Sequence, residues 1–229
     1  MSLKKIILEA RNISKTFQKT KTQKLEVLKE IDLDIEEQKL TIIVGASGAG
    51  KSTLLHIVSG LDTTENGTVK IKGTDIASLK EDKLAKFRNE HIGFVFQFHH
   101  LLPEFTAVEN IAIPQMVNGT SLKKASKKAE ELLNLVGLID RKDHKPAELS
   151  GGEQQRIAIA RAMANDPDII FADEPSGNLD SKNSEILHKL FIDLKEQRGV
   201  TFLMVTHNPE LVALGDRVLE MKDGKIFDR

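Results

Sequence analysis

Hydrophobic and polar residues alternate near both ends of the chain, with the period of two that is typical of half-buried strands. At the N-terminal end, two such segments, 6–17 and 25–35, are separated by the polar stretch 18–24. At the C-terminal end, segments 217–221 and 225–227 flank an Asp-Gly dipeptide, which favours a tight turn. We therefore predict one antiparallel hairpin at each end.

Three short apolar runs between the hairpins show no alternation, which predicts buried parallel strands at 40–44, 168–172 and 201–205. Helical patterns follow the first two runs, at 51–59 and 184–196, and the second helix has apolar residues at i, i+3, i+4 and i+7. Strands that alternate with helices in this way indicate an α/β core with a parallel sheet.

The middle of the chain has two helical patterns with little strand between them, at 107–117 and 122–136. The second pattern carries an apolar stripe on one side and lysines on the other. A lysine-rich face can bind nucleic acid, but without interleaved aromatic residues a solvated helix face is the better interpretation. We expect a mostly helical subdomain, residues 94–165, inserted into the core, and no nucleic-acid partner.

Composition sets limits on the whole molecule. A chain of 229 residues fits one domain, 1–229, in which residues 1–93 and 166–229 form the core. The 33 Lys and Arg against 34 Asp and Glu give a net charge of −1, which provides no overall attraction to nucleic acid or anionic lipid. The chain contains no Cys, which excludes disulfides and thiolate metal sites.

The sequence shows no signal for export or membrane insertion. The first residues, MSLKKIILEARN, lack the apolar run of a signal peptide. Apolar runs elsewhere fall far short of the approximately 20 residues that a transmembrane helix requires. We expect a cytoplasmic protein whose membrane association is peripheral.

The most specific chemical signal is a glycine-rich segment after the first apolar run. Residues 45–52 match G-x-x-x-x-G-K-[ST] between a predicted strand and a predicted helix. Backbone N–H groups of such a loop can surround phosphates, and the helix N-terminus adds a positive dipole end. We expect Lys51 at the β- and γ-phosphates, the Ser52 hydroxyl on Mg²⁺ and Thr53 near a phosphate. The predicted phosphate cradle is Gly45, Ala46, Ser47, Gly48, Ala49, Gly50, Lys51, Ser52 and Thr53.

An acidic pair, Asp173 and Glu174, follows the second apolar run. Such a pair after a strand can be a helix N-cap, but together with a P-loop it favours a magnesium site. Asp173 would hold the Mg²⁺ shell. Glu174 would orient or deprotonate an attacking water.

A third motif, LSGGEQQR at 149–156, has the features of a well-capped helix start. Ser150 is the expected N-cap, and Glu153 occupies the capping-box position. The same hydroxyl and the free N–H groups after it, in Gly151 and Gly152, could also cradle a phosphate. One chain with one nucleotide has no evident need of two cradles, whereas two chains arranged head to tail do.

These motifs resemble those of the ATP-binding subunits of ABC transporters over essentially the full length of the chain. The LSGGE stretch is similar to the ABC signature, and its occurrence with both Walker motifs in this order is highly specific. The resemblance implies a P-loop NTPase core of the ABC ATPase type with an antiparallel β subdomain and an inserted helical subdomain. It also implies ATP hydrolysis by a homodimer that holds two Mg·ATP between its copies.

The resemblance assigns further roles to single residues. Phe17 looks like the aromatic residue that stacks on adenine, although many relatives have Tyr there. Gln97 matches the Q-loop glutamine, residues 176–180 match the D-loop, whose Asp180 would contact nucleotide, and His207 matches the switch histidine. The expected magnesium ligands are Ser52, Gln97 and Asp173. The expected catalytic residues are Lys51, Gln97, Glu174 and His207.

A narrower resemblance concerns residues 97–110, QFHHLLPEFTAVEN. This string is similar to a segment that marks the ATPases of lipoprotein-releasing LolCDE complexes, where it faces membrane subunits. We expect a docking loop for LolC/LolE-like membrane subunits, at the cytoplasmic face of the inner membrane. Its expected anchors are Phe98, Leu101, Leu102 and Phe105. Metal binding by the adjacent His99 and His100 is disfavoured, because neighbouring residues on extended chain point apart and no third ligand is evident.

Three alternatives remain at this stage. The nearest is the ATPase of a related MacB-type exporter or an FtsE-like division regulator. A soluble ABC protein that acts on DNA or ribosomes usually has tandem ATPase domains or a long coiled-coil insertion, for which this chain has no room. A P-loop kinase would need an acceptor site and has no use for LSGGE.

Overall fold

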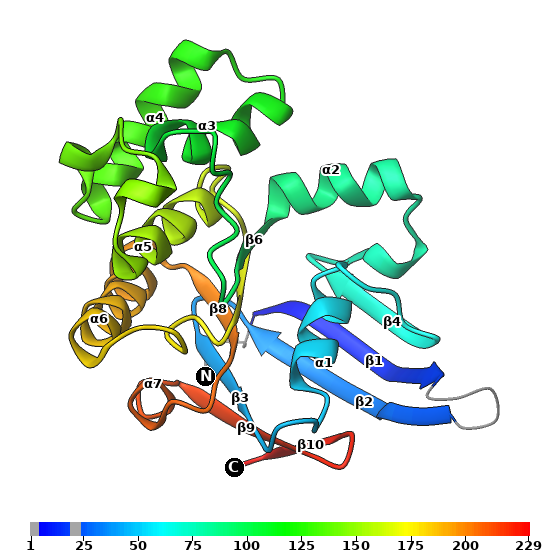
Figure 1. Ribbon diagram of the computed structural model, residues 1–229. Coiled ribbons are helices and arrows are strands. Elements are labelled where there is room, and N and C mark those ends of the chain that lie inside the picture. The colour runs from blue at the N-terminus through cyan, green and yellow to red at the C-terminus, as the bar shows by residue number, and fades with distance from the viewer. Residues whose placement is uncertain (1–4, 19–23) are drawn as a thin grey trace.

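Two sheets form the framework of the computed structural model, which describes residues 5–18 and 24–229. The strands of the smaller sheet are β1 (Ile6–Gln18), β2 (Lys24–Glu36), β4 (Asn66–Ile71) and β5 (Thr74–Asp75). The strands of the larger sheet are β3 (Leu40–Val44), β6 (Ile92–Val95), β7 (Ile169–Asp173), β8 (Thr201–Val205), β9 (Arg217–Lys222) and β10 (Lys225–Asp228). Their spatial orders are β2-β1-β4-β5 and β10-β9-β3-β8-β7-β6 (Figure 1).

Helices connect these strands. They are α1 (Lys51–Val58), α2 (Glu81–His91), α3 (Ala107–Val117), α4 (Leu122–Leu135), α5 (Gly151–Ala162), α6 (Ser181–Arg198) and α7 (Pro209–Val212). Short 3₁₀ turns lie at Ile76–Ser78, Ile139–Arg141 and Pro146–Glu148. The four predicted helices are confirmed, but α6 begins at Ser181 instead of 184, because the Asp180 side chain caps it by accepting a hydrogen bond from the Asn183 N–H.

Both predicted hairpins are confirmed. Strands β1 and β2 pair antiparallel, with Phe17 opposite Leu25, and β9 and β10 pair antiparallel as well. Asp223 and Gly224 have φ of 51° and 79°, the positive values that a type I′ turn requires. Most of the polar connection of the first hairpin, residues 19–23, lies outside the described residues, as do residues 1–4 of the segment without a signal-peptide pattern.

The three apolar runs are confirmed as parallel neighbours in the larger sheet. The second strand starts at Ile169 rather than 168, and the Asp168 carboxylate contacts Lys72 at 2.8 Å and His91 at 2.7 Å. The sequence patterns did not predict β4, β5, β6 and α2. They also missed that β9 runs parallel to β3, which makes the C-terminal hairpin part of the core sheet.

Side chains of the larger sheet divide between two hydrophobic cores. On β7, Ile169 and Phe171 face a core that also contains the buried residues of α1 and of the smaller sheet. Ile170 and Ala172 face the opposite core, which contains residues of α3, α4, α5 and α6. The strands are therefore buried on both faces, which explains their continuous apolar sequence.

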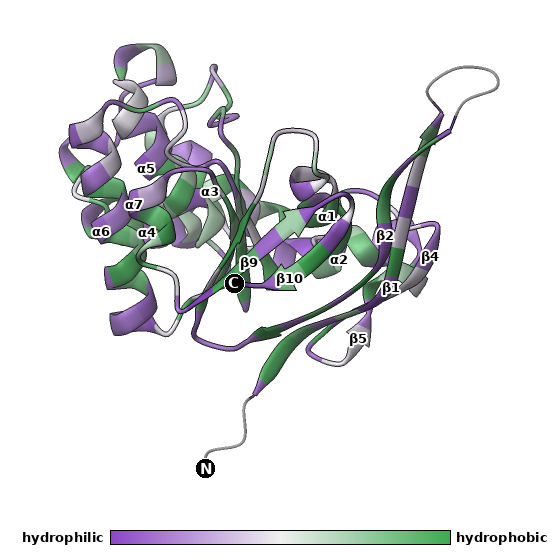
Figure 2. Cartoon of the chain, turned by 90° about the horizontal axis from the view of Figure 1, so that it is seen from below, coloured by the Kyte–Doolittle hydropathy of each residue, from purple (hydrophilic) through white to green (hydrophobic). Residues whose placement is uncertain are grey.

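The helices α3, α4 and α5 pack against one another within the predicted segment 94–165, and the antiparallel sheet lies at the opposite side of the molecule (Figures 1 and 2). The first two residues of the predicted segment 94–165 differ from the expectation, because Phe94 and Val95 pair with β7 as the end of β6. No helix in the described part of the chain has the length and apolar character needed to cross a bilayer.

Candidate active site

A cleft of about 730 Å³ opens where the P-loop, residues 45–52, meets residues that follow the central parallel strands. This is the edge of an open α/β sheet at which ligands bind. We call it the P-loop cleft. The predicted site residues that line it are Phe17, Gly45, Ser47, Gly48, Gly50, Lys51, Ser52, Thr53, Gln97, Glu174 and His207. Ala46 and Ala49 line an adjoining cleft of about 540 Å³ instead.

The P-loop conformation depends on its glycines. Gly50 has a φ of 100° and caps α1 without any side-chain hydrogen bond, which leaves the first N–H groups of the helix to a ligand. At Gly45, a Cβ atom would lie 2.2 Å from the backbone oxygen of Met221 on β9. The Lys51 Nζ contacts the carbonyl oxygens of Gly45 at 2.8 Å and Ala46 at 3.0 Å, and so lies over the loop.

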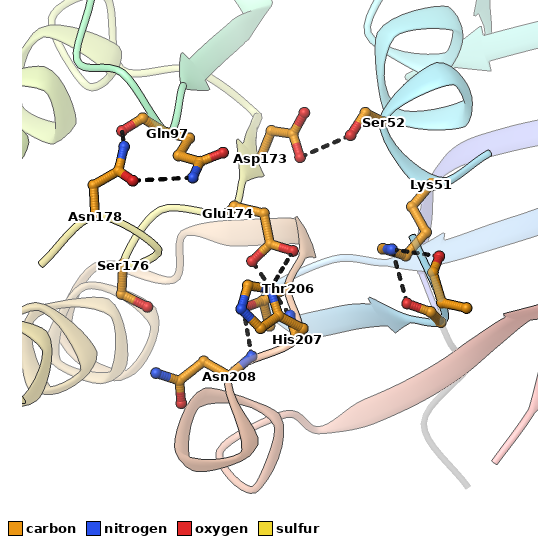
Figure 3. A network of polar contacts seen from close by, with 12 residues as sticks. Lys51, Ser52, Gln97, Asp173, Glu174, Ser176, Asn178, Thr206, His207 and Asn208 are labelled. Atoms are coloured by element: carbon orange, nitrogen blue, oxygen red, sulfur yellow. Dashed lines mark hydrogen bonds and ion pairs between the residues drawn. The ribbon is translucent and has the colours of Figure 1, made fainter. Parts of the chain in front are cut away.

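Asp173, which is not among the residues that line the P-loop cleft, is hydrogen-bonded to Ser52, which is. Asp173 ends β7, and its Oδ1 accepts a hydrogen bond from the Ser52 Oγ at 3.1 Å (Figure 3). Burial raises the pKa of the Asp173 carboxyl above its usual value, although the Ser52 hydroxyl and His56 act in the opposite direction. The His56 Nε2 is buried without a hydrogen-bond partner among the described residues, 3.8 Å from Asp173 Oδ2. Its i+4 spacing from Ser52 on α1 could have identified this neighbour.

Glu174 and His207 form a close pair at the ends of β7 and β8. Glu174 has a φ of 46°, and its N–H donates to the Val205 carbonyl at 2.9 Å, which turns the carboxylate toward the next strand. Its Oε1 lies 2.8 Å from the His207 Nδ1, and its Oε2 accepts from the His207 N–H at 3.3 Å (Figure 3). The His207 side chain is 74% exposed and therefore open to a ligand.

Gln97 has a partner that sequence reasoning missed. Its Nε2 donates to the Asn178 Oδ1 at 3.2 Å, and the Asn178 Nδ2 donates to the Gln97 carbonyl at 3.3 Å (Figure 3). Asn178 lies in the segment 176–180, so the structure links two predicted loops. No local pattern could have shown this contact, because 81 residues separate its partners.

Phe17 lies at the end of β1 and is 43% exposed. Leu25 and Val27 of the paired strand β2 extend the apolar wall of the P-loop cleft beside it. Neither was predicted as a site residue, although both occur in the alternating pattern of the hairpin. An aromatic face with apolar neighbours is a suitable surface for stacking a base.

The signature segment lies away from the P-loop cleft. Ser150 and Glu153 form the predicted capping box: the Glu153 Oε2 accepts from the Ser150 N–H and hydroxyl, both at 2.8 Å. The hydrogen bond from the Ser150 N–H is the main reason that the pKa of Glu153 is lowered. Gly152 packs so closely that a Cβ would lie 2.2 Å from the Asn183 Oδ1. Neither Ser150 nor Gly151 is among the lining residues of this chain's cleft.

Asp180, which the sequence predicts to contact nucleotide, caps a helix within this chain. Its carboxylate accepts from the Asn183 N–H at 2.8 Å and Nδ2 at 2.7 Å as the N-cap of α6. These bonds, first of all the one from the backbone, lower its pKa. Like the signature, it is not among the residues that line the cleft.

The predicted docking loop, residues 97–110, exposes three of its four predicted anchors. Phe98 is 65%, Leu102 42% and Phe105 41% exposed. Leu101 is instead half-buried and packs against the core that contains residues of α3, α4, α5 and α6.

Two residues that the sequence did not single out hold the docking loop. The buried Asn110 accepts from the Leu102 N–H at 2.7 Å and donates to the carbonyls of Leu102 and Phe105. Arg161 of α5 donates to the carbonyls of His99 and His100 at 2.9 and 2.6 Å. The loop is thereby tied to the helix that the signature starts.

The chain matches the ABC transporter family over residues 28–177. It is 53% identical over 221 residues to the lipoprotein-releasing system ATP-binding protein LolD of Cytophaga hutchinsonii, with 96% of this chain and 99% of that protein covered. It is 54% identical over 222 residues to the LolD of Porphyromonas gingivalis, with 97% and 99% covered. A solved structure, the dimeric post-hydrolysis state of the ATP-binding cassette MJ0796 bound to ADP and Pi, has a TM-score of 0.88 at 39% identity and covers 97% of this chain and 98% of that one.

These likenesses confirm the predicted ABC ATPase fold and the predicted ATPase activity, and they extend over nearly the whole chain. The match includes the P-loop and the signature, and the structural neighbour is a cassette bound to the products of ATP hydrolysis. The chain therefore belongs to the ABC transporter family of ATP-hydrolysing subunits and, within that family, to the LolD group of ATP-binding proteins.

Proposed function

We propose that the P-loop cleft holds ATP with its phosphates on the N–H groups before α1 and its adenine on Phe17. The observation that carries this proposal is the convergence of the P-loop, Glu174 and His207 on one cleft. Lys51 lies over the loop through its contacts with two loop carbonyls, and it exchanges them for the β- and γ-phosphates. Thr53 lines the same cleft and contacts a phosphate.

The donor set beside the P-loop fits a magnesium ion. The Ser52 Oγ and Asp173 Oδ1 lie 3.1 Å apart, and both are the hard oxygen ligands that Mg²⁺ prefers. Gln97, which lines the cleft with Ser52, adds an amide oxygen. When bound, the ion neutralises charge on the phosphates.

The Glu174–His207 pair supplies the hydrolytic groups. Glu174 accepts a proton from the attacking water, and the hydrogen bond from the His207 backbone N–H to its Oε2 fixes its direction. His207, which is exposed toward the cleft, donates a hydrogen bond to the γ-phosphate as charge develops there. Gln97 orients the water from the side of the docking loop.

A complete site requires a second copy. Ser150, Gly151 and Gly152 of one copy reach the nucleotide on the other copy, where Asp180 also approaches. This arrangement is supported by the dimeric structural neighbour and by the position of the signature outside the chain's own cleft. The helical subdomain, residues 94–165, moves against the core of residues 1–93 and 166–229 when the dimer closes and opens.

We also propose that this motion powers lipoprotein release by LolC/LolE-like membrane subunits at the cytoplasmic face of the inner membrane. The support is the name of the LolD relatives and the exposed apolar docking loop within residues 97–110. Bonds from Arg161 tie that loop to the signature helix, so partner and nucleotide sites move together.

The docking loop can be tested by co-purification. The double variant F98D/L102D removes two exposed apolar anchors, and we expect it to lose the membrane subunits from detergent extracts while binding ATP as the wild type does. V117D is the matched control, because Val117 is 74% exposed at the end of α3, outside the loop. Retention of the membrane subunits by F98D/L102D, or recovery of a membrane partner other than a lipoprotein-releasing complex, would contradict the proposal.

A further inference from the structure

A lysine covers one face of the Phe17 ring. Lys15 lies two residues earlier on β1 and therefore on the same face of the strand. Its Nζ is 5.4 Å from the centroid of the Phe17 ring, within the range of cation–π interactions. The Lys15 side chain is only 12% exposed, so the ammonium group is held against the protein.

Two groups hold this lysine in place. The Lys15 Nζ donates to the Asp62 Oδ1 at 2.9 Å and to the Thr63 carbonyl at 2.6 Å. Burial would raise the pKa of Asp62, but the hydrogen bonds from Lys15 and the Thr63 N–H lower it below its usual value, so the carboxylate is ionised.

The segment that holds Lys15, residues 61–63, is hydrogen-bonded to α1, the helix that follows the P-loop. The N–H groups of Leu61 and Asp62 donate to the His56 carbonyl of α1 at 2.8 and 3.1 Å. Since α1 starts at the P-loop, Lys15 connects the Phe17 ring on the smaller sheet to the helix that begins at the P-loop.

We propose that Lys15 is a positioning residue for the base of the nucleotide. It covers one face of the Phe17 ring and presents the other face to the base, at a fixed distance from the P-loop. The inference rests on the proposed function, which assigns Phe17 to adenine. Phe17 is 43% exposed at a strand end. Without Lys15, its ring would be free to move in the unbound protein and would lose that conformational freedom when the base binds. Because Asp62 neutralises the Lys15 charge, the effect concerns the base and not the phosphates.

The variant K15M, which keeps most of the aliphatic stem, tests this role. We expect the Kd of the full chain for Mg·AMP-PNP, measured by calorimetry, to rise about two- to fivefold, the size of an exposed cation–π interaction. The Kd for magnesium tripolyphosphate, which has no base, is expected to stay unchanged. K15R should restore most of the AMP-PNP affinity. K70M is the matched control, because Lys70 is exposed on the neighbouring strand β4.

A double-mutant cycle with F17A makes the test specific. If Lys15 acts through Phe17, K15M has no further effect on AMP-PNP binding in the F17A background. Three results would each overturn this inference without touching the proposed function. They are equal losses of affinity for AMP-PNP and tripolyphosphate, an unchanged Kd of K15M for AMP-PNP, and an effect of K15M that is as large in the F17A background as in the wild type. Wild-type affinity in F17A would instead overturn the proposed role of Phe17, and this inference with it.

A second variant covers the case in which K15M does not fold. D62N removes the charged tether but keeps the lysine, and we expect a loss of AMP-PNP affinity in the same direction with tripolyphosphate binding unchanged. An AMP-PNP affinity equal to that of the wild type in D62N would count against a tethered lysine.

Discussion

The P-loop half and the signature half of the proposed nucleotide site use their polar groups differently within one chain. In the P-loop half, hydrogen bonds join segments far apart in sequence, such as Ser52 to Asp173 at 3.1 Å and Glu174 to His207 at 2.8 Å. In the signature half, Ser150 satisfies its polar groups three residues away, on Glu153.

This difference shows which half depends on the tertiary fold. The sheet brings the P-loop half together and directs its groups into a cleft. The signature half is a local helix cap, in which the exposed Ser150 pairs with Glu153 of the same helix. Under the proposed function, the first half is assembled when the chain folds, whereas the second gains its role only when another copy approaches.

The largest expected effect comes from the P-loop half. We expect E174Q to lower phosphate release by about 10²–10⁴-fold, because the amide cannot accept the proton from water. The Kd for Mg·ATP should stay within the error of the measurement. The control is E185Q, which changes an exposed carboxylate on α6. Turnover near the wild-type rate in E174Q would show that another group is the base.

A second experiment tests whether the two halves belong to different copies. We expect S150R to lower turnover by about 10²-fold, the size of losing one preorganised donor to a transition state, while the chain still binds ATP. K51A should also be inactive. Mixing the two inactive variants creates heterodimers with one intact composite site, so part of the turnover should return. Full activity of S150R alone, or no recovery in the mixture, would contradict the head-to-tail arrangement.

The smallest expected effect concerns stability and pH. The raised pKa of Asp173 means that the folded state binds its proton more readily than the unfolded state does, so the ionised carboxylate costs stability above the folded-state pKa. We expect D173N to increase the free energy of unfolding at pH 7, and this gain should disappear below about pH 4, where the carboxyl is neutral in both states.

The opposite sign is expected for D62N, because the pKa of Asp62 is lowered. This variant should lose stability at pH 7, and the loss should shrink as the pH falls through the folded-state pKa of Asp62. Urea unfolding of D173N, D62N and the wild type, at pH 7 and below about pH 4, measures these changes in the free energy of unfolding. A gain in D173N that does not depend on pH would show that the desolvated charge is not its cause.

Much of the fold follows from sequence patterns, since continuous apolar strands, alternating hairpins and helical stripes are local properties. The predicted hairpins, parallel strands and helices all form. Strands β4, β5 and β6 were not predicted, because their sequence patterns are weak. Their place is decided by pairing of β4 with β1, of β5 with β4 and of β6 with β7. Asp180 shows a related limit, since its motif position says nothing about the cap that occupies its carboxylate.

The sequence by itself determined the P-loop, the acidic pair after its strand and the capped signature helix, because each is a short motif whose chemistry depends on adjacent residues. Only the tertiary structure decided the contacts of Gln97 with Asn178 and of Lys15 with Asp62, and the partial burial of Leu101. These contacts join segments that the chain separates widely, and packing of the sheets and helices, not local backbone preference, sets their distances.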